Sequence, residues 1–127
     1  MNDTVTVLYV EDEDDIREMT EFALEDEGFE LIQCVSGQDA LEKAAGVHPD
    51  LILLDVMMPG MDGVSTAQKL REMPHLADVP VIFMTAKVQQ TEVEKYKAMG
   101  AIGVIKKPFD AMELPDQIRE LLESAND

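Results

Sequence analysis

The sequence of 127 residues lacks most of the features that crosslink a protein or anchor it in a membrane. It has one cysteine, no tryptophan, and no apolar run near the roughly 20 residues of a membrane-spanning helix. A single cysteine excludes an intrachain disulfide and a zinc site built from several thiolates. Cys34 lies in an apolar stretch and is expected to be a small core residue. No basic segment precedes an apolar core at the amino terminus, so we expect a cytoplasmic protein without membrane insertion.

Basic residues are also scarce. Lysine and arginine number 10 against 27 aspartates and glutamates, so the formal net charge is −17 at pH 7. Direct binding to nucleic acid or to an anionic membrane needs a basic patch, and the acidity argues against both. A solvated acidic surface is the simplest interpretation of this charge, and binding to cations or to a basic partner is the alternative. Hydrophobic residues make up 46% of the chain, which is enough for a packed core in a single domain over residues 1–127.

Short apolar runs alternate with longer amphipathic segments along the chain. This alternation predicts an α/β fold, in which a parallel sheet has helices on both faces and right-handed crossovers. In doubly wound sheets of this kind the functional residues lie at the carboxyl ends of the strands. Strands are expected at 4–10, 29–35, 51–54, 79–84 and 102–106, and helices at 14–27, after the N-cap Ser36, and at 64–72, 91–99 and 110–124.

Charged and hydroxyl side chains follow four of the expected strands. Three carboxylates would share one crevice, and two charges 4 Å apart repel by about 4 kcal/mol at an effective dielectric near 20. They therefore need a counter-charge or a raised pKa, and Mg²⁺ is a cation that suits carboxylates. The alternative for the acidic run is a solvated loop that leads into a helix. The residues at the strand ends are Glu11 and Asp12, Asp55, Thr85, and Lys106 and Lys107.

Asp55 favours the metal-binding interpretation because it ends a wholly apolar strand. A carboxylate at the floor of a crevice is costly to desolvate without a partner. It can act as a nucleophile toward phosphorus and form an aspartyl phosphate. A cation and Lys107 would offset the charge of the transferring group, and the Thr85 hydroxyl could donate to a phosphoryl oxygen.

Four ordered motifs closely resemble the receiver domain of two-component response regulators, in particular the stand-alone chemotaxis type. The resemblance covers essentially the whole chain and implies a flavodoxin-like, doubly wound five-stranded parallel sheet in the order 2-1-3-4-5 with five helices. The motifs are Val10–Glu13, Pro49–Gly63, Pro80–Ala86 and Lys106–Phe109.

The resemblance also implies a role for each matching residue and Mg²⁺ as the cofactor. Lys107 is preferred over Lys106 because it directly precedes Pro108 and because neighbouring side chains alternate along a strand. The implied catalytic residues are Asp55 as phosphoacceptor, Thr85 as switch hydroxyl and Lys107, and the implied metal site comprises Glu11, Asp12, Asp55 and the main-chain carbonyl of Met57.

By the same resemblance the protein is a phosphorelay switch. It would take a phosphoryl group from a sensor histidine kinase, a phosphotransfer protein or a small phosphodonor, and it would catalyse its own phosphorylation and dephosphorylation rather than turn over an external substrate. A downstream protein target would bind the face formed by the fourth helix, fifth strand and fifth helix of a monomer or weak homodimer. The family often has an aromatic residue where this chain has Val104. We therefore expect the output to pass through the loop after Thr85 and the fourth helix.

Two other functions are open on the sequence alone. An aspartate-nucleophile phosphotransferase or phosphatase would act on a small substrate, but such enzymes pair the nucleophile with an acid two residues later, where this chain has Met57. A scaffold that no longer switches would have no need of Asp55, Thr85 and Lys107 together.

Overall fold

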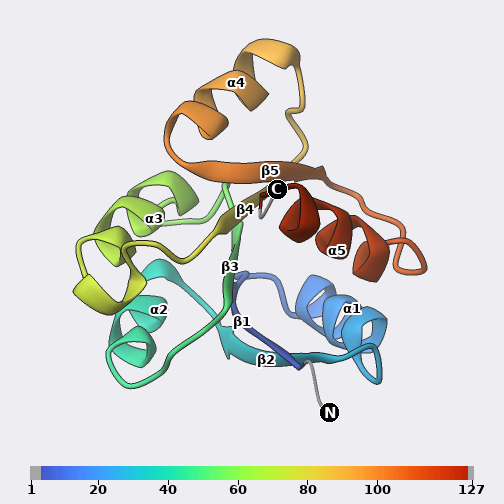
Figure 1. Ribbon diagram of the computed structural model, residues 1–127, viewed down its shortest axis with the longest axis horizontal. Helices are drawn as coiled ribbons and strands as arrows, with labels where there is room; N and C mark the ends of the chain where they lie inside the picture. The colour runs from blue at the N-terminus through green and yellow to red at the C-terminus, as the bar shows by residue number, and fades with distance from the viewer. Residues whose placement is uncertain (1–3, 126–127) are drawn as a thin grey trace.

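The computed structural model describes residues 4–125, which form a five-stranded parallel sheet covered by helices on both faces (Figure 1). The strands stand in the order β2-β1-β3-β4-β5, so the predicted fold class and strand order are confirmed. The strands are β1 (Val5–Val10), β2 (Phe29–Cys34), β3 (Leu51–Asp55), β4 (Val81–Thr85) and β5 (Ala101–Lys106). The helices are α1 (Asp14–Leu24), α2 (Gly37–Ala44), α3 (Gly63–Arg71), α4 (Gln90–Ala98) and α5 (Leu114–Ala125), with a 3₁₀ turn at Pro74–Leu76 that the sequence did not predict.

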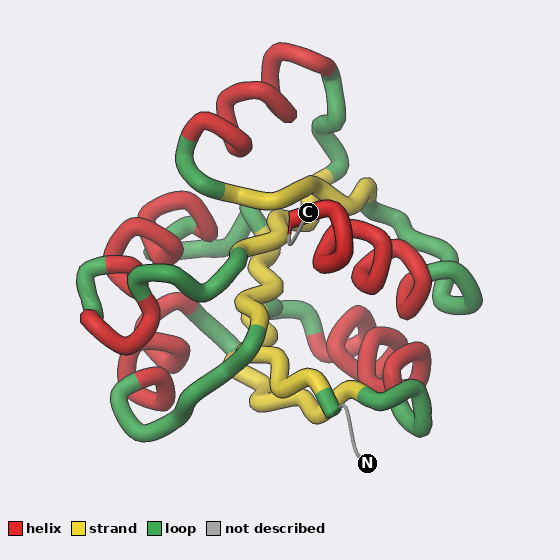
Figure 2. The backbone as a smooth tube through the Cα atoms, in the orientation of Figure 1, coloured by secondary structure: helices red, strands yellow, loops and turns green. Residues whose placement is uncertain are grey.

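Two hydrophobic clusters hold the layers together, one on each face of the sheet. One cluster joins the sheet to α2, α3 and α4, and the other joins it to α1 and α5. Figure 2 shows how these helices are arranged around the strands. Every residue of β3 and β4 is buried, as expected of central parallel strands covered on both faces. Cys34 is buried, in agreement with its predicted place in the core.

Two helix boundaries differ from the prediction by more than one residue. The first helix ends at Leu24 rather than Glu27, because Asp26 has a φ of 62° and the chain has left the helical conformation. The last helix begins at Leu114 rather than Asp110, since Asp110 folds residues 111–113 into a turn. Its carboxylate accepts from the Met112 N–H and its carbonyl accepts from the Leu114 N–H. Pro115 therefore falls in the first turn of α5, where a missing N–H is tolerated.

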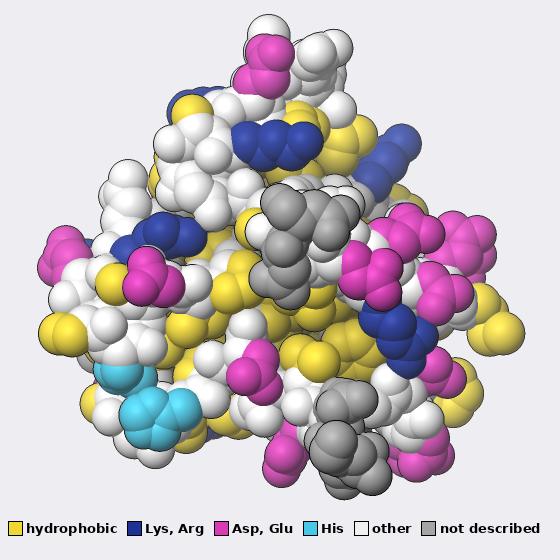
Figure 3. Space-filling model, in the orientation of Figure 1, with side chains coloured by type: hydrophobic (Ala, Val, Ile, Leu, Met, Phe, Trp, Pro, Cys, Tyr) yellow, Lys and Arg dark blue, Asp and Glu magenta, His cyan; other side chains and the backbone are white. Residues whose placement is uncertain are grey.

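Charge is distributed unevenly over the surface. Figure 3 shows acidic side chains gathered on the side where α1 and α5 lie, and several basic side chains nearer to α4 and β5. Five of the 10 basic residues fall between positions 87 and 107: Lys87, Lys95, Lys97, Lys106 and Lys107. No helix of the described residues is long and apolar enough to cross a membrane.

The start of α3 is packed directly against the end of β3. Gly63 donates its N–H to the Val56 carbonyl at 2.9 Å, and a Cβ at Gly63 would collide with the carbonyl oxygen of Asp55 and come within 2.8 Å of Val56 Cα. Neither obstacle is a flexible side chain, so the backbone itself would have to move. Only glycine therefore fits at this position without displacing Asp55.

We predict that Gly63→Ala lowers the free energy of unfolding by about 2 kcal/mol, as overpacking against a fixed backbone does. Urea unfolding followed by circular dichroism measures this change. Gly46→Ala is the matched control, because a Cβ there meets nothing within 4 Å, and its effect should stay within about 0.5 kcal/mol. Equal midpoints for the two variants would contradict the close packing described for Gly63.

Candidate phosphoacceptor and metal site

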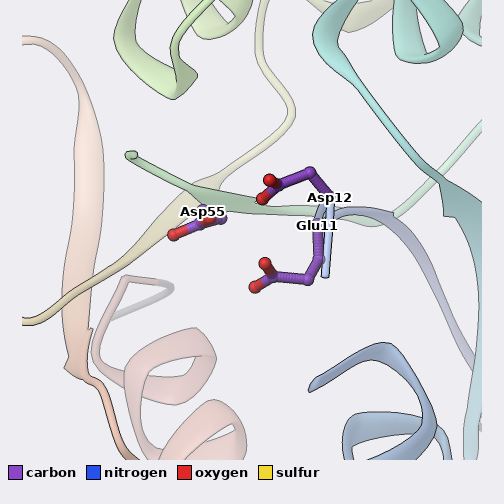
Figure 4. A group of neighbouring side chains, drawn as sticks. All are labelled: Glu11, Asp12 and Asp55. Atoms are coloured by element: carbon purple, nitrogen blue, oxygen red, sulfur yellow. The ribbon is translucent and has the colours of Figure 1, made fainter. Parts of the chain in front are cut away.

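Three carboxylates converge at the carboxyl end of the sheet (Figure 4). Glu11 and Asp12 follow β1, and Asp55 is the last residue of β3. One oxygen from each of the three lies within 4.8 Å of one from each of the others. Glu11 is fully buried, Asp55 is 3% exposed, and Asp12 is half-buried, so the group opens to solvent mainly on the side of Asp12.

Lys107 neutralises part of this charge. Its Nζ donates to Oε1 of Glu11 at 2.9 Å and to Oδ1 of Asp55 at 3.1 Å. The main chain places it there, because the Lys107 N–H continues the β4–β5 ladder by donating to the Thr85 carbonyl at 2.9 Å. The neighbouring Lys106 is exposed. The structure thus brings Lys107, rather than Lys106, to the carboxylates, in the orientation that the sequence predicted.

The protonation of Glu11 reflects this environment. Burial raises the pKa of Glu11 to about 7, and the nearby Asp55 adds to the rise while the hydrogen bond from Lys107 opposes it. Burial by itself would lower the pKa of Lys107, but the hydrogen bonds to Glu11 and Asp55 outweigh burial and raise it. The Lys107 ammonium therefore stays charged at neutral pH, whereas the buried Glu11 carboxyl group populates both its neutral and its ionised form.

The remaining predicted residues, Thr85 and Met57, differ in how far they are exposed to solvent. Thr85 ends β4 and is 2% exposed, and its hydroxyl oxygen accepts from the Lys87 N–H at 3.1 Å. Met57 lies two residues after Asp55 in the loop to α3, and its side chain is 68% exposed. The role of its main-chain carbonyl as a metal ligand stays a prediction.

Sequence reasoning missed two supports of the site. Arg17 on α1 donates to the Glu11 carbonyl at 2.8 Å and also pairs with Asp14, which fixes the turn that carries the acidic pair. The close packing of Gly63 against Asp55 fixes the other side. The sequence positions of these two residues only weakly indicate such a role. Arg17 lies in the first turns of the predicted helix that follows the acidic residues, and Gly63 lies directly before a predicted helix.

Oxygen ligands from two or three carboxylates around a partly open space are the donor set that a hard divalent cation such as Mg²⁺ prefers. A cation there would stabilise the ionised form of Glu11 and relieve the repulsion between the carboxylates. The residues present therefore fit a magnesium site.

We predict that Lys107→Met lowers the free energy of unfolding of the metal-free protein by about 3 kcal/mol, since it leaves two buried carboxylates without a counter-charge. The loss should be larger at pH 8 than at pH 6. Lys107 lowers the pKa of Glu11, which burial raises to about 7. Loss of Lys107 therefore costs most above about pH 7, where the wild-type carboxyl is ionised, and less below it, where the carboxyl is already neutral. Urea unfolding at the two pH values measures the effect.

The matched control is Lys106→Met, which removes an exposed lysine from the adjacent position. Its effect should be below about 0.5 kcal/mol at both pH values. Similar losses for both variants would mean that Lys107 does not balance a buried charge.

Comparison with known proteins places this chain in a family. Residues 7–119 match the response regulator receiver domain. The chain is 41% identical over 122 residues to the transcriptional regulatory protein CseB of Streptomyces coelicolor, and 38% identical over 117 residues to the phosphate regulon transcriptional regulatory protein PhoB of Pseudomonas aeruginosa. These alignments cover 96% and 92% of this chain but 51% of each relative, so the chain spans about half the length of these curated relatives.

Solved structures agree with the sequence comparison. The chemotaxis response regulator CheY4 of Vibrio cholerae superimposes with a TM-score of 0.86 at 30% identity, over 93% of this chain and 98% of that one. The receiver domain of the Francisella response regulator 1452 gives 0.83 at 25% identity, over 96% and 99%. The shared strand order, the carboxylates at the strand ends and the match over residues 7–119 lead to one conclusion: the chain belongs to the receiver domain family of two-component response regulators.

Proposed function

We propose that this receiver domain accepts a phosphoryl group on Asp55 in a reaction that depends on Mg²⁺. The observation that carries the proposal is the position of Asp55, whose buried carboxylate contacts the Lys107 ammonium and lies within reach of Glu11 and Asp12. Receiver domains bind Mg²⁺ at an acidic pocket and interact with histidine kinases or phosphotransfer proteins.

Each residue has a distinct task in this reaction. An Asp55 oxygen attacks phosphorus, the bond to the donor's leaving group breaks, and the leaving group departs with its electron pair. Lys107 stabilises the negative charge on the phosphoryl oxygens, for which it must loosen its contact with the Asp55 oxygen that attacks. Glu11, Asp12, Asp55 and the main-chain carbonyl of Met57 would hold the metal, which would supply further charge stabilisation when bound.

Thr85 would respond to the phosphorylation of Asp55. Its hydroxyl oxygen accepts from the Lys87 N–H in the unphosphorylated protein, and its O–H can donate to a phosphoryl oxygen on Asp55. The energetic logic is a population shift, because a new hydrogen-bond acceptor favours one arrangement of Thr85 and of the loop that follows it.

The downstream target would bind the face formed by α4, β5 and α5. An open hollow of about 530 Å³ on this side begins one residue after Thr85, so a movement of Thr85 would change its shape. The lining residues of the hollow are Ala86, Lys87, Val88, Gln89, Glu92 and Lys106.

We further propose that residues 1–127 act as one domain in the cytoplasm, as a monomer or weak homodimer.

We predict that wild-type protein incorporates labelled phosphate from acetyl phosphate with Mg²⁺, and that Asp55→Asn abolishes this incorporation. The label should be released by hydroxylamine, as an acyl phosphate is, and omission of Mg²⁺ should suppress labelling because the carboxylates then repel the donor. Autoradiography or mass spectrometry of the intact protein measures the incorporation.

Asp50→Asn is the matched control. Asp50 is exposed immediately before β3, where its carboxylate accepts from the Thr6 N–H, and its replacement should leave labelling unchanged. Labelling that survives in Asp55→Asn would refute Asp55 as the acceptor. Continuous hydrolysis of a small phosphate ester by the wild-type protein would instead indicate a phosphatase.

A further inference from the structure

Helix α4 is attached to the rest of the described protein by one buried side chain. Of the residues of α4, Tyr96 alone is buried, at 5% exposure. Its ring packs against the ring of Phe83 on β4, with the centroids 5.0 Å apart and the planes tilted by 47°. Val104, the neighbour of Phe83 on β5, packs against the same cluster and is too small to replace either ring. The position of α4 over the sheet therefore depends on the contact between Tyr96 and Phe83.

The two ends of α4 are held very differently. At its carboxyl end the Gly100 carbonyl accepts from the Arg71 guanidinium at 3.0 Å, and a Cβ at Gly100 would come within 2.9 Å of that group. At its amino end the N-cap residue Gln89 makes no side-chain hydrogen bond. The loop that leads to Gln89 is tied back through the hydrogen bond from the Lys87 N–H to the Thr85 hydroxyl. The carboxyl end can thus act as a pivot, while the amino end can move.

Thr85 and Phe83 lie on β4, the strand that pairs with β3, and β3 ends at Asp55. They are two residues apart on β4, so their side chains lie on the same face of the sheet. If the Thr85 hydroxyl turns toward a phosphoryl group on Asp55, its hydrogen bond with the Lys87 N–H is strained or lost. The loop before α4 is then released, and the ring of Tyr96 must be reseated on Phe83.

The surroundings of the Tyr96 hydroxyl fit a group that stays neutral through this change. Burial raises the pKa of Tyr96, and the carboxylates of Glu92 and Asp62 add to the rise. Asp62 is the N-cap of α3 and ends the loop that follows Asp55. The pKa of Tyr96 therefore depends in part on a carboxylate at the end of that loop.

We propose that Tyr96 is the positioning residue that couples the phosphorylation of Asp55 to the position of α4, by pivoting the helix at Gly100 and reseating the Tyr96 ring on Phe83. This inference rests on the proposed function, because it needs a phosphoryl group on Asp55. Beyond the proposed function, Tyr96 is a specific residue on α4 whose contact with the sheet would change when Asp55 is phosphorylated.

The test uses the two tyrosines of the chain, Tyr9 and Tyr96, both labelled as 3-fluorotyrosine and followed by fluorine NMR. Tyr96→Phe identifies the Tyr96 resonance by its loss. With acetyl phosphate and Mg²⁺ we expect this resonance to move in the wild-type protein in proportion to the phosphorylated fraction, which mass spectrometry gives for the same sample.

Thr85→Ala and Thr85→Ser separate mechanical coupling from a direct effect of the added charge. At equal phosphorylated fraction the movement of the Tyr96 resonance should be lost in Thr85→Ala and kept in Thr85→Ser, which retains the hydroxyl. A Tyr96 resonance that stays in place in phosphorylated wild-type protein would overturn the inference, and so would an equal movement in Thr85→Ala. If Asp55 takes no phosphoryl group at all, the proposed function itself fails and the inference falls with it.

Hydrogen exchange gives a second measurement. Phosphorylation should change the exchange of the amides of residues 86–98 several-fold in the wild-type protein and in Tyr96→Phe, which keeps the ring contact. In Tyr96→Ala the exchange should become independent of phosphorylation, although Asp55 is still phosphorylated to the same extent. A difference that persists in Tyr96→Ala would show that α4 responds without Tyr96.

Discussion

The bridge from the Lys107 ammonium to Glu11 and Asp55 is the interaction on which the rest of the structure depends. The three residues lie at the carboxyl ends of β1, β3 and β5, which are far apart in the sequence. All three strands belong to a sheet that helices cover on both faces, so the bridge lies in a region of low dielectric constant. Without a positive charge there, two buried carboxylates would face one another, which lowers the free energy of unfolding by about 3 kcal/mol. The fold and the site are therefore stabilised together.

The same interaction shows why a divalent cation would suit the carboxylate cluster of this strongly acidic domain. One ammonium cannot neutralise three carboxylates, and burial together with the nearby Asp55 raises the pKa of Glu11, which favours a bound proton on this carboxyl group. A bound divalent cation would remove this need by balancing the remaining negative charge of the three carboxylates. Most of the net charge of −17 lies elsewhere, much of it on the exposed faces of α1 and α5, where it is solvated.

Much of this arrangement could be predicted from the sequence, because it follows from local patterns. The apolar run of β3 placed Asp55 at the end of a buried strand, and the alternation of side chains along β5 distinguished Lys107 from Lys106. Contacts between distant residues could not be predicted in this way. Glu11 and Lys107 are 96 positions apart, and the pairing of Tyr96 with Phe83 depends on how α4 settles on the sheet. The helix ends at Leu24 and Leu114 were predicted wrongly, because a left-handed residue and a capping turn outweighed helical periodicity.

The central claim is that the carboxylate cluster is a cation site whose charge is balanced by protons when the metal is absent. Carbon NMR of the Glu11 carboxyl group during a pH titration tests this claim most directly, with and without Mg²⁺. The account predicts a midpoint near pH 7 in the metal-free protein and a midpoint well below that value when Mg²⁺ is present, because the bound cation favours the ionised carboxylate. The same midpoint under both conditions, or an ordinary value in the metal-free protein, would contradict it.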